Sequence, residues 1–345
     1  MLTKAYAVRS ATSALEPFEL ERREPGPTDI EIEIAYCGIC HSDIHQARNE
    51  WGNSLYPMVP GHEIAGRVSK AGAKVRGFRP GDHAGIGCLV DSCRRCSNCR
   101  EGVEQFCERG ASFTYNSTEQ DRKTPTFGGY SSRIVVDEAF ALRIPASQPL
   151  ERIAPLFCAG ITTYSPLKRF GVRRGQRVGV LGLGGLGHMA VKIAAALGAE
   201  VTVLSGSPAK RADAKRLGAH DFALTSELKN ALALQGRFDL ILDTVAARHD
   251  VNAALGWLKI GGQLVLVGAP PEPLEVNAFS LLTRKSISGS VIGGLAETQE
   301  MLDFCVRKKV VSDVEVISIR QVNEAYERMM RGDVRYRFVI DLKTL

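Results

Sequence analysis

The distribution of apolar and polar residues along the chain separates two regions of different type. Within residues 1–150, short apolar runs that read as strands occur at 30–38, 62–72 and 128–138, separated by turn segments rich in Gly and Pro. The run at 30–38 (IEIEIAYCG) alternates apolar and polar positions with a period of two, which is typical of a half-buried strand. We therefore predict a small β-rich domain of barrel type over residues 1–150.

From Gln176 onward the pattern changes to an alternation of apolar strands and helices. Strands are predicted at 176–182, 200–205, 238–245 and 263–269, and helices at 185–198, 208–218 and 251–259. Alternation at this spacing is typical of βαβ units and of a parallel sheet covered on both faces. The fold class is therefore α/β, with a doubly wound parallel sheet of Rossmann type over 151–287. Residues 288–345 mix helices and strands and are predicted to return to the first domain, which makes that domain discontinuous.

Composition narrows the classes of function. The chain has 345 residues, 44% of them hydrophobic and 24% charged, and a net charge of +6 without a dense basic run. This disfavours nucleic acid as a partner. The apolar stretches are short and rich in glycine, unlike a membrane span, and residues 1–20 lack the pattern of a signal peptide. We expect a cytoplasmic protein without membrane or nucleic-acid partners.

Four cysteines form the first candidate metal site. Cys93, Cys96, Cys99 and Cys107 make a C-x2-C-x2-C-x7-C array within a polar lobe at 88–110. Four thiolates at this spacing are typical of a structural zinc site, which is closed and takes no part in chemistry. A disulfide-rich loop is the alternative, which the odd total of nine cysteines and the reduced character of the remaining chain disfavour. Cys37, Cys88 and Cys305 are expected to be buried thiols.

A glycine-rich loop predicts binding of a dinucleotide. It fits G-x-G-x-x-G, follows a predicted strand and opens a predicted helix, which is the context that gives this motif its meaning. The glycines allow a tight turn and a close approach to a pyrophosphate, which the helix N-terminus attracts. The residues assigned to this loop are Gly182, Gly184, Gly185, Leu186 and Gly187.

The end of the next strand indicates which dinucleotide binds. An NAD site has an acidic residue there to accept hydrogen bonds from the ribose, whereas this chain has Ser205, Ser207, Lys210 and Arg211. Two hydroxyls and two cations favour the 2′-phosphate of NADP(H). The alternative, that Lys210 and Arg211 are the solvated start of a helix, places cations where they oppose the helix dipole.

A second metal site is suggested by Cys40 in CGICHSD and His62 in GHEIAG. Two cysteines and one histidine are a known ligand set for a catalytic zinc, which keeps its fourth position open. Spacing alone does not select the second cysteine.

These motifs together resemble the zinc-dependent medium-chain alcohol dehydrogenases. The segments YPMVPGHEIAG, LFCAGITTYSPL, SISGSVIGG and DVRYRFVIDL are similar to the cinnamyl alcohol dehydrogenase branch, and over the whole chain to its bacterial broad-range NADPH-dependent aldehyde reductases. The resemblance implies a GroES-like catalytic domain and a catalytic zinc held by Cys40, His62 and Cys158. It also implies two zinc ions per chain.

The same resemblance implies roles for residues around that zinc. Glu63 would be a neighbouring carboxylate able to ligate when the site is empty, and Asp43 would accept a hydrogen bond from His62. Ser42 would contact the substrate oxygen and pass its proton through the nicotinamide ribose to His45. Two further residues match family positions near the pyrophosphate, His41 and Arg337.

The sequence therefore predicts an NADP-dependent oxidoreductase that acts on primary alcohols and aldehydes, mainly as an aldehyde reductase. Two alternatives remain, an NAD-preferring alcohol dehydrogenase and a non-catalytic member of the fold that binds NADPH. The presence of every zinc ligand and relay residue disfavours the second. The family suggests a homodimer formed through the Rossmann sheets, with 286–294 as the edge strand. His83, His220 and His249 lack a partner motif and are expected at the surface or in turns.

Overall fold

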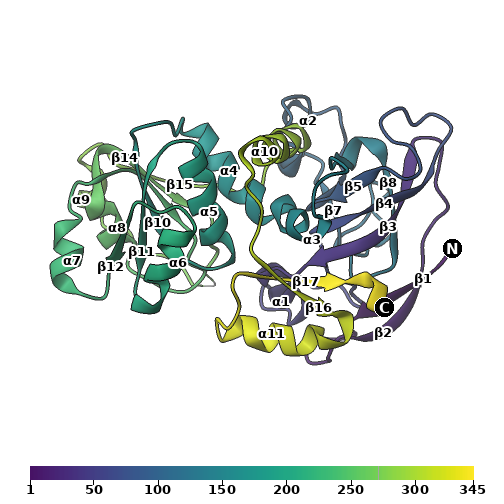
Figure 1. The fold of residues 1–345 in the computed structure, drawn as a ribbon. Coiled ribbons are helices and arrows are strands. Elements are labelled where there is room, and N and C mark those ends of the chain that lie inside the picture. The colour runs from purple at the N-terminus through teal and green to yellow at the C-terminus, as the bar shows by residue number, and fades with distance from the viewer. Residues whose placement is uncertain (271) are drawn as a thin grey trace. The chain divides into compact units, whose positions relative to one another are not determined.

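The computed structural model describes residues 1–270 and 272–345. Its contacts divide the chain into two compact units (Figure 1). Unit 1 comprises Met1–Cys158, Gly293–Val306 and Val311–Leu345, and unit 2 comprises Ala159–Ile292 and Arg307–Val310. The domain boundaries at residues 150 and 287 stay predictions.

Unit 1 is built on a mainly antiparallel sheet of strand order β16-β17-β3-β4-β5-β9, in which β8 also pairs with β3. The pair β16–β17 is parallel and the other pairs are antiparallel. The strands are β3 (Asp29–Gly38), β4 (Ile64–Ala71), β5 (His83–Ile86), β8 (Arg133–Asp137), β9 (Leu142–Arg143), β16 (Val314–Ser318) and β17 (Arg337–Asp341).

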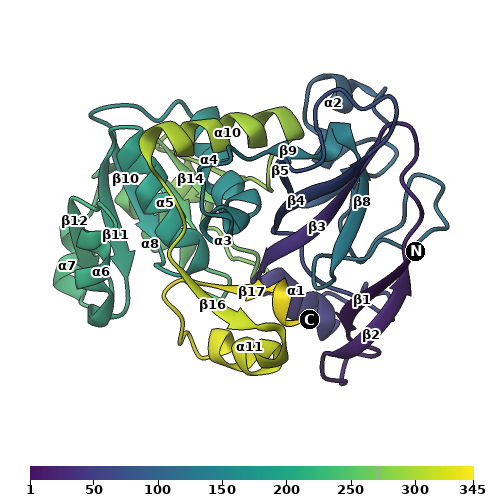
Figure 2. The same ribbon diagram turned by 45° about the vertical axis from the view of Figure 1, so that its right-hand side comes forward.

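Strand β3 is the centre of this sheet, because it pairs with β4, β8 and β17. Its alternating isoleucines Ile30, Ile32 and Ile34 are all buried, as the period of two predicts, but Glu31 between them is buried as well, so this strand is more than half-buried. The C-terminal strand β17, drawn in yellow, lies against the purple β3 in Figures 1 and 2. The chain therefore returns to its first region, as the sequence indicates.

Smaller elements complete unit 1. Two antiparallel two-stranded sheets are formed by β1 (Leu2–Ala7) with β2 (Glu16–Glu21) and by β6 (Leu89–Asp91) with β7 (Ser112–Phe113). The α-helices are α1 (His41–Ala47), α2 (Ser97–Arg100), α3 (Leu150–Ile153), α11 (Val322–Met330) and α10 (Leu295–Lys308), whose last two residues belong to unit 2. The 3-10 turns are η1 (Glu104–Phe106), η2 (Glu138–Phe140), η3 (Ala154–Phe157), η5 (Ile319–Gln321) and η6 (Leu342–Thr344).

Unit 2 contains an all-parallel sheet of strand order β12-β11-β10-β13-β14-β15 (Figure 2). Numbered from its first strand, this order is 3-2-1-4-5-6, which is that of a Rossmann fold and confirms the predicted class. The strands are β10 (Arg177–Leu181), β11 (Glu200–Ser205), β12 (Asp221–Leu224), β13 (Phe238–Asp243), β14 (Leu258–Leu266) and β15 (Ser286–Gly289). Strand β15 is an edge strand, as predicted.

Helices connect these strands, and α5 packs on β10 and β11 while α8 packs on β14. The helices and the one 3-10 turn described for unit 2 are α4 (Ala159–Arg169), α5 (Gly185–Ala196), η4 (Pro208–Lys210), α6 (Arg211–Arg216), α7 (Leu228–Ala233), α8 (Val251–Trp257) and α9 (Ala278–Leu281). Within the described residues, none of the helices of either unit is both long and apolar enough to cross a bilayer.

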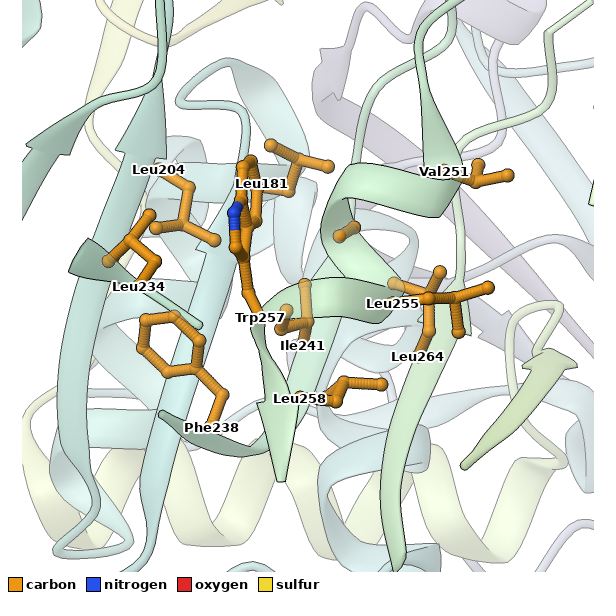
Figure 3. Packing of buried hydrophobic residues seen from close by; sticks show 11 residues of the cluster. Leu181, Leu204, Leu234, Phe238, Ile241, Val251, Leu255, Trp257, Leu258 and Leu264 are labelled. Carbon is orange, nitrogen blue, oxygen red and sulfur yellow. The ribbon is translucent and has the colours of Figure 1, made fainter. Parts of the chain in front are cut away.

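Helix α8 is held on the sheet by a buried apolar cluster (Figure 3). Leu255 and Trp257 of α8 pack with Leu204 of β11, Ile241 of β13 and their neighbours. The cluster reaches Leu181, the last residue before the glycine-rich loop. Packing of α8 therefore supports the strand from which the candidate nucleotide site begins.

We expect Leu255→Ala to lower the free energy of unfolding by about 2–5 kcal/mol, because it removes buried methyl groups from a filled core. The matched control is Leu228→Ala in α7, where the leucine is 74% exposed, and its effect should stay within about 0.5 kcal/mol. Urea unfolding followed by circular dichroism measures both. Equal effects of the two substitutions would contradict this account of the core.

Candidate active site

The pairing of β3 with β4 brings together the first three members of a buried cluster. Cys40 follows the end of β3 and is the N-cap of α1, whereas His62 and Glu63 directly precede β4. Because the strands are antiparallel, these two segments lie side by side, and the Gly38 amide donates to the Glu63 carbonyl at 2.9 Å.

Cys158 joins them from a distant part of the sequence. It follows η3, which packs on β3, β4 and β5. One ligand atom from each of Cys40, His62, Glu63 and Cys158 lies within 4.8 Å of the others, and all four residues are buried. The two Sγ atoms are 3.9 Å apart.

The chemistry of this donor set fits a zinc ion. Glu63 Oε2 is buried and has no hydrogen-bond partner among the described residues, so an acceptor in the cluster is unsatisfied. The pKa of the Cys40 thiol is lowered well below its usual value, chiefly by its hydrogen bond with Cys158, which favours the thiolate that a metal requires. Two cysteines and a histidine leave one position for a substrate in a tetrahedral site.

Asp43 orients the imidazole of the cluster. This carboxylate is fully buried, and Oδ1 lies 3.3 Å from His62 Nδ1 and 3.3 Å from the Gly61 amide nitrogen. Oδ2 accepts a hydrogen bond of 2.8 Å from the Cys40 amide. A hydrogen bond at Nδ1 leaves Nε2 available as the metal-binding nitrogen.

Glu63 also forms an ion pair with Arg337, the first residue of β17, and both side chains are buried. Burial raises the pKa of Glu63 to about 7, although the neighbouring guanidinium lowers it. Arg337 and His41 both belong to unit 1. Their predicted role near the pyrophosphate stays a prediction.

The two residues of the predicted proton relay lie one turn apart on α1. Ser42 Oγ is 3.6 Å from Cys40 Sγ, which places this hydroxyl beside the cluster. His45 pairs with Glu50 through Nδ1, and its ring centroid lies 5.0 Å from that of Trp51. With its side chain 17% exposed, His45 lies between the buried cluster and solvent.

The four cysteines of the lobe converge as their spacing predicts. Their sulfur atoms lie within 4.8 Å of one another. The amide of Cys96 donates to Cys93 Sγ and the amide of Cys93 donates to Cys107 Sγ, each at 3.4 Å. Backbone hydrogen bonds from Arg95 and Cys96 lower the pKa of the Cys93 thiol to about 6. The arrangement fits a closed site of four thiolates.

The lobe is fastened to the rest of unit 1 at two places. Strands β6 and β7 pair at its base, and Glu104 Oε2 accepts a hydrogen bond of 3.0 Å from the amide of Leu295, the first residue of α10. Ordering the lobe therefore also fixes the N-terminus of a long helix.

The glycine-rich loop of unit 2 has the geometry that a pyrophosphate needs. Gly182 has φ +88, and a Cβ at Gly187 would lie 2.2 Å from the carbonyl oxygen of Gly182. Gly184 is the N-cap of α5, and a Cβ placed on it would meet no atom of the described chain within 4 Å. The amides at the start of α5 are thus approachable by an anion.

The predicted 2′-phosphate residues follow the end of β11. Ser205 is the last residue of that strand, and its Oγ accepts a hydrogen bond of 3.2 Å from the Ser207 amide. Lys210 is the last residue of η4. The guanidinium of Arg211 lies 4.7 Å from the centroid of the Phe222 ring, so this cation is already engaged within unit 2.

Comparison with known proteins identifies the family. The profile of the family "Zinc-binding dehydrogenase" matches residues 185–307, and that of "Alcohol dehydrogenase GroES-like domain" matches residues 26–146. The chain belongs to the zinc-binding dehydrogenases. This confirms the resemblance seen in the sequence and the GroES-like character of the first domain.

Individual relatives are similar to this chain over almost their whole lengths. NADP-dependent alcohol dehydrogenase C of Mycobacterium tuberculosis is 53% identical over 342 residues, which are 99% of each chain. Aldehyde reductase YahK of Escherichia coli is 51% identical over 348 residues, covering 100% of this chain and 99% of the relative. The solved structure of a cinnamyl alcohol dehydrogenase of Sorghum bicolor has a TM-score of 0.97 and 44% identity, with 99% and 98% of the chains covered.

Sequence reasoning missed three features of this dehydrogenase. Cys88 was expected to be an ordinary buried thiol, but it is half-buried and its thiol interacts with Cys158 of the cluster. His249, expected at the surface or in a turn, is half-buried in a loop, and its Nε2 lies 2.6 Å from Asp243 Oδ2 at the end of β13. Tyr130 donates a hydrogen bond of 3.1 Å to Asp43. The Cys88 and Tyr130 contacts depend on tertiary structure, whereas the His249 contact is local, and no motif signals any of them.

The two zinc sites of the dehydrogenase should be separable by mutation. Cys40→Ala should abolish turnover and remove one zinc while the fold remains intact, because the other buried contacts at the end of β3 persist. Cys99→Ala should remove the other zinc and lower Tm by roughly 5–10 °C, since a loss of 1 kcal/mol lowers Tm by about 2–4 °C. Metal analysis and thermal unfolding measure both effects. Unchanged Tm and metal content in Cys99→Ala would refute a structural role for the lobe.

Proposed function

We propose that the chain is a zinc-dependent oxidoreductase that interconverts aldehydes and primary alcohols with NADP(H), acting mainly as a broad-range aldehyde reductase. The observation that carries this proposal is the buried cluster of Cys40, His62 and Cys158, with Glu63 beside it. The names of the relatives, an NADP-dependent alcohol dehydrogenase and an aldehyde reductase, support the reaction class.

Cys40, His62 and Cys158 would hold the catalytic zinc, and the four-cysteine lobe would hold a second, structural one. When bound, the catalytic zinc supplies Lewis acidity toward the substrate oxygen, and NADP(H) supplies or accepts the hydride. The side chains do the rest. Asp43 fixes the orientation of His62, and Arg337 partly neutralises Glu63 in a site where an unpaired carboxylate is costly.

Ser42 and His45 would move the proton that the reaction consumes or releases. The hydroxyl of Ser42 lies beside Cys40, close to where the substrate oxygen must bind. The His45 imidazole is partly exposed and contacts Glu50 through Nδ1, so it would be the group that passes the proton to solvent. A serine inside and a histidine at the surface form a route out of a buried site.

The preference for NADP(H) is assigned to the end of β11. Ser205 and Ser207 present hydroxyl and amide groups there, and Lys210 follows within the next turn. A carboxylate at this position would repel the 2′-phosphate, and none occurs between Ser205 and Ala212. Arg211 contributes less directly, because its guanidinium stacks on Phe222.

We also propose a cytoplasmic homodimer. The outer edge of β15 carries backbone groups that a second copy could pair with, which is a common way to extend a sheet across a twofold axis. Three apolar side chains near this edge, Phe279, Leu282 and Val291, are 79%, 73% and 52% exposed. Exposed apolar groups of this size support an interface with a second copy at this edge. The unbridged cysteines support a reducing compartment.

His45→Gln should lower kcat by about 10²-fold and weaken the dependence of the rate on pH, because an amide cannot carry the proton. Binding of NADPH, measured by fluorescence titration, should change little. The matched control is His220→Gln in unit 2, whose imidazole lies outside the cluster and should not affect either quantity. A wild-type pH–rate profile in His45→Gln would exclude His45 from the relay.

Ser205→Asp should reduce kcat/KM for NADPH at least tenfold, because a carboxylate repels the 2′-phosphate and one charge-assisted hydrogen bond is worth roughly 1.5–3 kcal/mol. The same carboxylate can accept hydrogen bonds from the ribose of NADH, so activity with NADH should hold or rise. Steady-state kinetics with both dinucleotides give the ratio of kcat/KM for NADPH to kcat/KM for NADH. A ratio for the wild type near or below one would instead favour the NAD-preferring alternative.

A further inference from the structure

A chain of buried hydroxyls leads from α11 to the candidate metal ligand His62. Tyr326 of α11 donates to the Tyr130 hydroxyl at 3.4 Å, and Tyr130 donates to Asp43 Oδ2 at 3.1 Å. The other oxygen of Asp43 lies 3.3 Å from His62 Nδ1. All four residues belong to unit 1 and form one continuous path.

The path is shielded from solvent along its whole length. Asp43 and Tyr130 are 0% exposed, and Tyr326 is 4% exposed. The Tyr115 ring, itself buried, stacks on the His62 imidazole at 5.7 Å between centroids. A carboxylate enclosed in this way has only protein donors to compensate its charge, so each donor matters more than it would in water.

The tyrosines remain donors near neutral pH. Burial raises the pKa of both Tyr130 and Tyr326 well above the usual value, and the negative charge of Asp43 raises it further. The Tyr130 hydroxyl therefore keeps its proton on the hydrogen bond to Asp43. The Tyr130 hydroxyl and the backbone amide of Cys40 both donate to Oδ2 of Asp43, and the Cys40 side chain is itself a candidate metal ligand.

We propose that Tyr130 and Tyr326 are positioning residues for the catalytic metal site, which act through Asp43 on His62. Tyr130 fixes the rotation of the Asp43 carboxylate and takes up part of its charge, and Tyr326 holds the Tyr130 hydroxyl in place. Together they determine how well Asp43 orients the imidazole, and hence how tightly His62 and Cys40 hold the ion. The inference rests on the metal site of the proposed function.

The affinity for zinc tests this inference without relying on turnover. Tyr130→Phe keeps the ring and removes only the hydroxyl, so it should raise the Kd for zinc at this site by about tenfold, the lower end of the range for outer-shell partners. Tyr326→Phe should raise Kd less. In the Tyr130→Phe background it should have no further effect, because its hydroxyl acts through Tyr130.

The measurement is competition of the purified holoenzyme with a chromogenic chelator, with Tm recorded in parallel. The Cys40→Ala variant should hold zinc only in the four-cysteine lobe. The phase of zinc release that this variant lacks is therefore the one that belongs to the Cys40 site. The matched control is Tyr56→Phe, which removes a tyrosine hydrogen bond of 2.9 Å to the carbonyl of Ala47, the last residue of α1, rather than to the Asp43 carboxylate. It should leave Kd unchanged.

Two results would overturn this inference and leave the proposed function intact. One is a Kd for Tyr130→Phe equal to that of Tyr56→Phe, and the other is an undiminished effect of Tyr326→Phe in the Tyr130→Phe background. If the wild type held one zinc per chain and lacked any phase that Cys40→Ala removes, the metal site itself would be refuted, and the proposed function with it.

Discussion

The structure of unit 1 depends on one constraint, the burial of several acidic groups at one end of β3. Two thiols, Cys40 and Cys158, and two carboxylates, Asp43 and Glu63, lie together away from water. A buried charge without compensation is costly, so each must find a cation or several hydrogen-bond donors. Asp43 is satisfied by amides, an imidazole and a phenol, whereas Glu63 receives a guanidinium and keeps one oxygen unsatisfied. A dication would complete this balance, so the cluster fits a metal site as well as a core.

The same constraint explains why unit 1 is discontinuous in sequence. The cation that compensates Glu63 is Arg337, which opens β17, and β17 pairs antiparallel with β3. Tyr326 reaches the cluster from α11, in the same returning segment. The C-terminal segment therefore supplies the cation that pairs with Glu63 and a hydroxyl that donates to Tyr130, and both partners lie within the first 158 residues.

The features that sequence reasoning predicted correctly are those whose determinants are local. The strand–helix period of unit 2 and the glycine-rich loop each follow from neighbouring residues, and the Rossmann strand order and the family were confirmed. Contacts between distant residues were not accessible in this way. Cys158 was assigned only through the resemblance, and the pairs Glu63–Arg337 and Tyr130–Asp43 join residues whose spacing carries no motif. Strand order sets the Glu63–Arg337 pair, since β4 and β17 flank β3 on its two sides.

The two candidate zinc sites differ in how the chain brings their ligands together. The lobe collects Cys93 to Cys107 from a short segment with little apolar content, so the metal itself must supply much of the free energy that orders it. In the candidate catalytic cluster, Cys40 and Cys158 are 118 residues apart, and the strands and η3 offset the loop-closure entropy without requiring an ion. The fold thus holds the second set of ligands together in advance. Metal affinity there depends on how accurately the ligands are oriented, which is the task of the Asp43 carboxylate and the hydroxyls behind it.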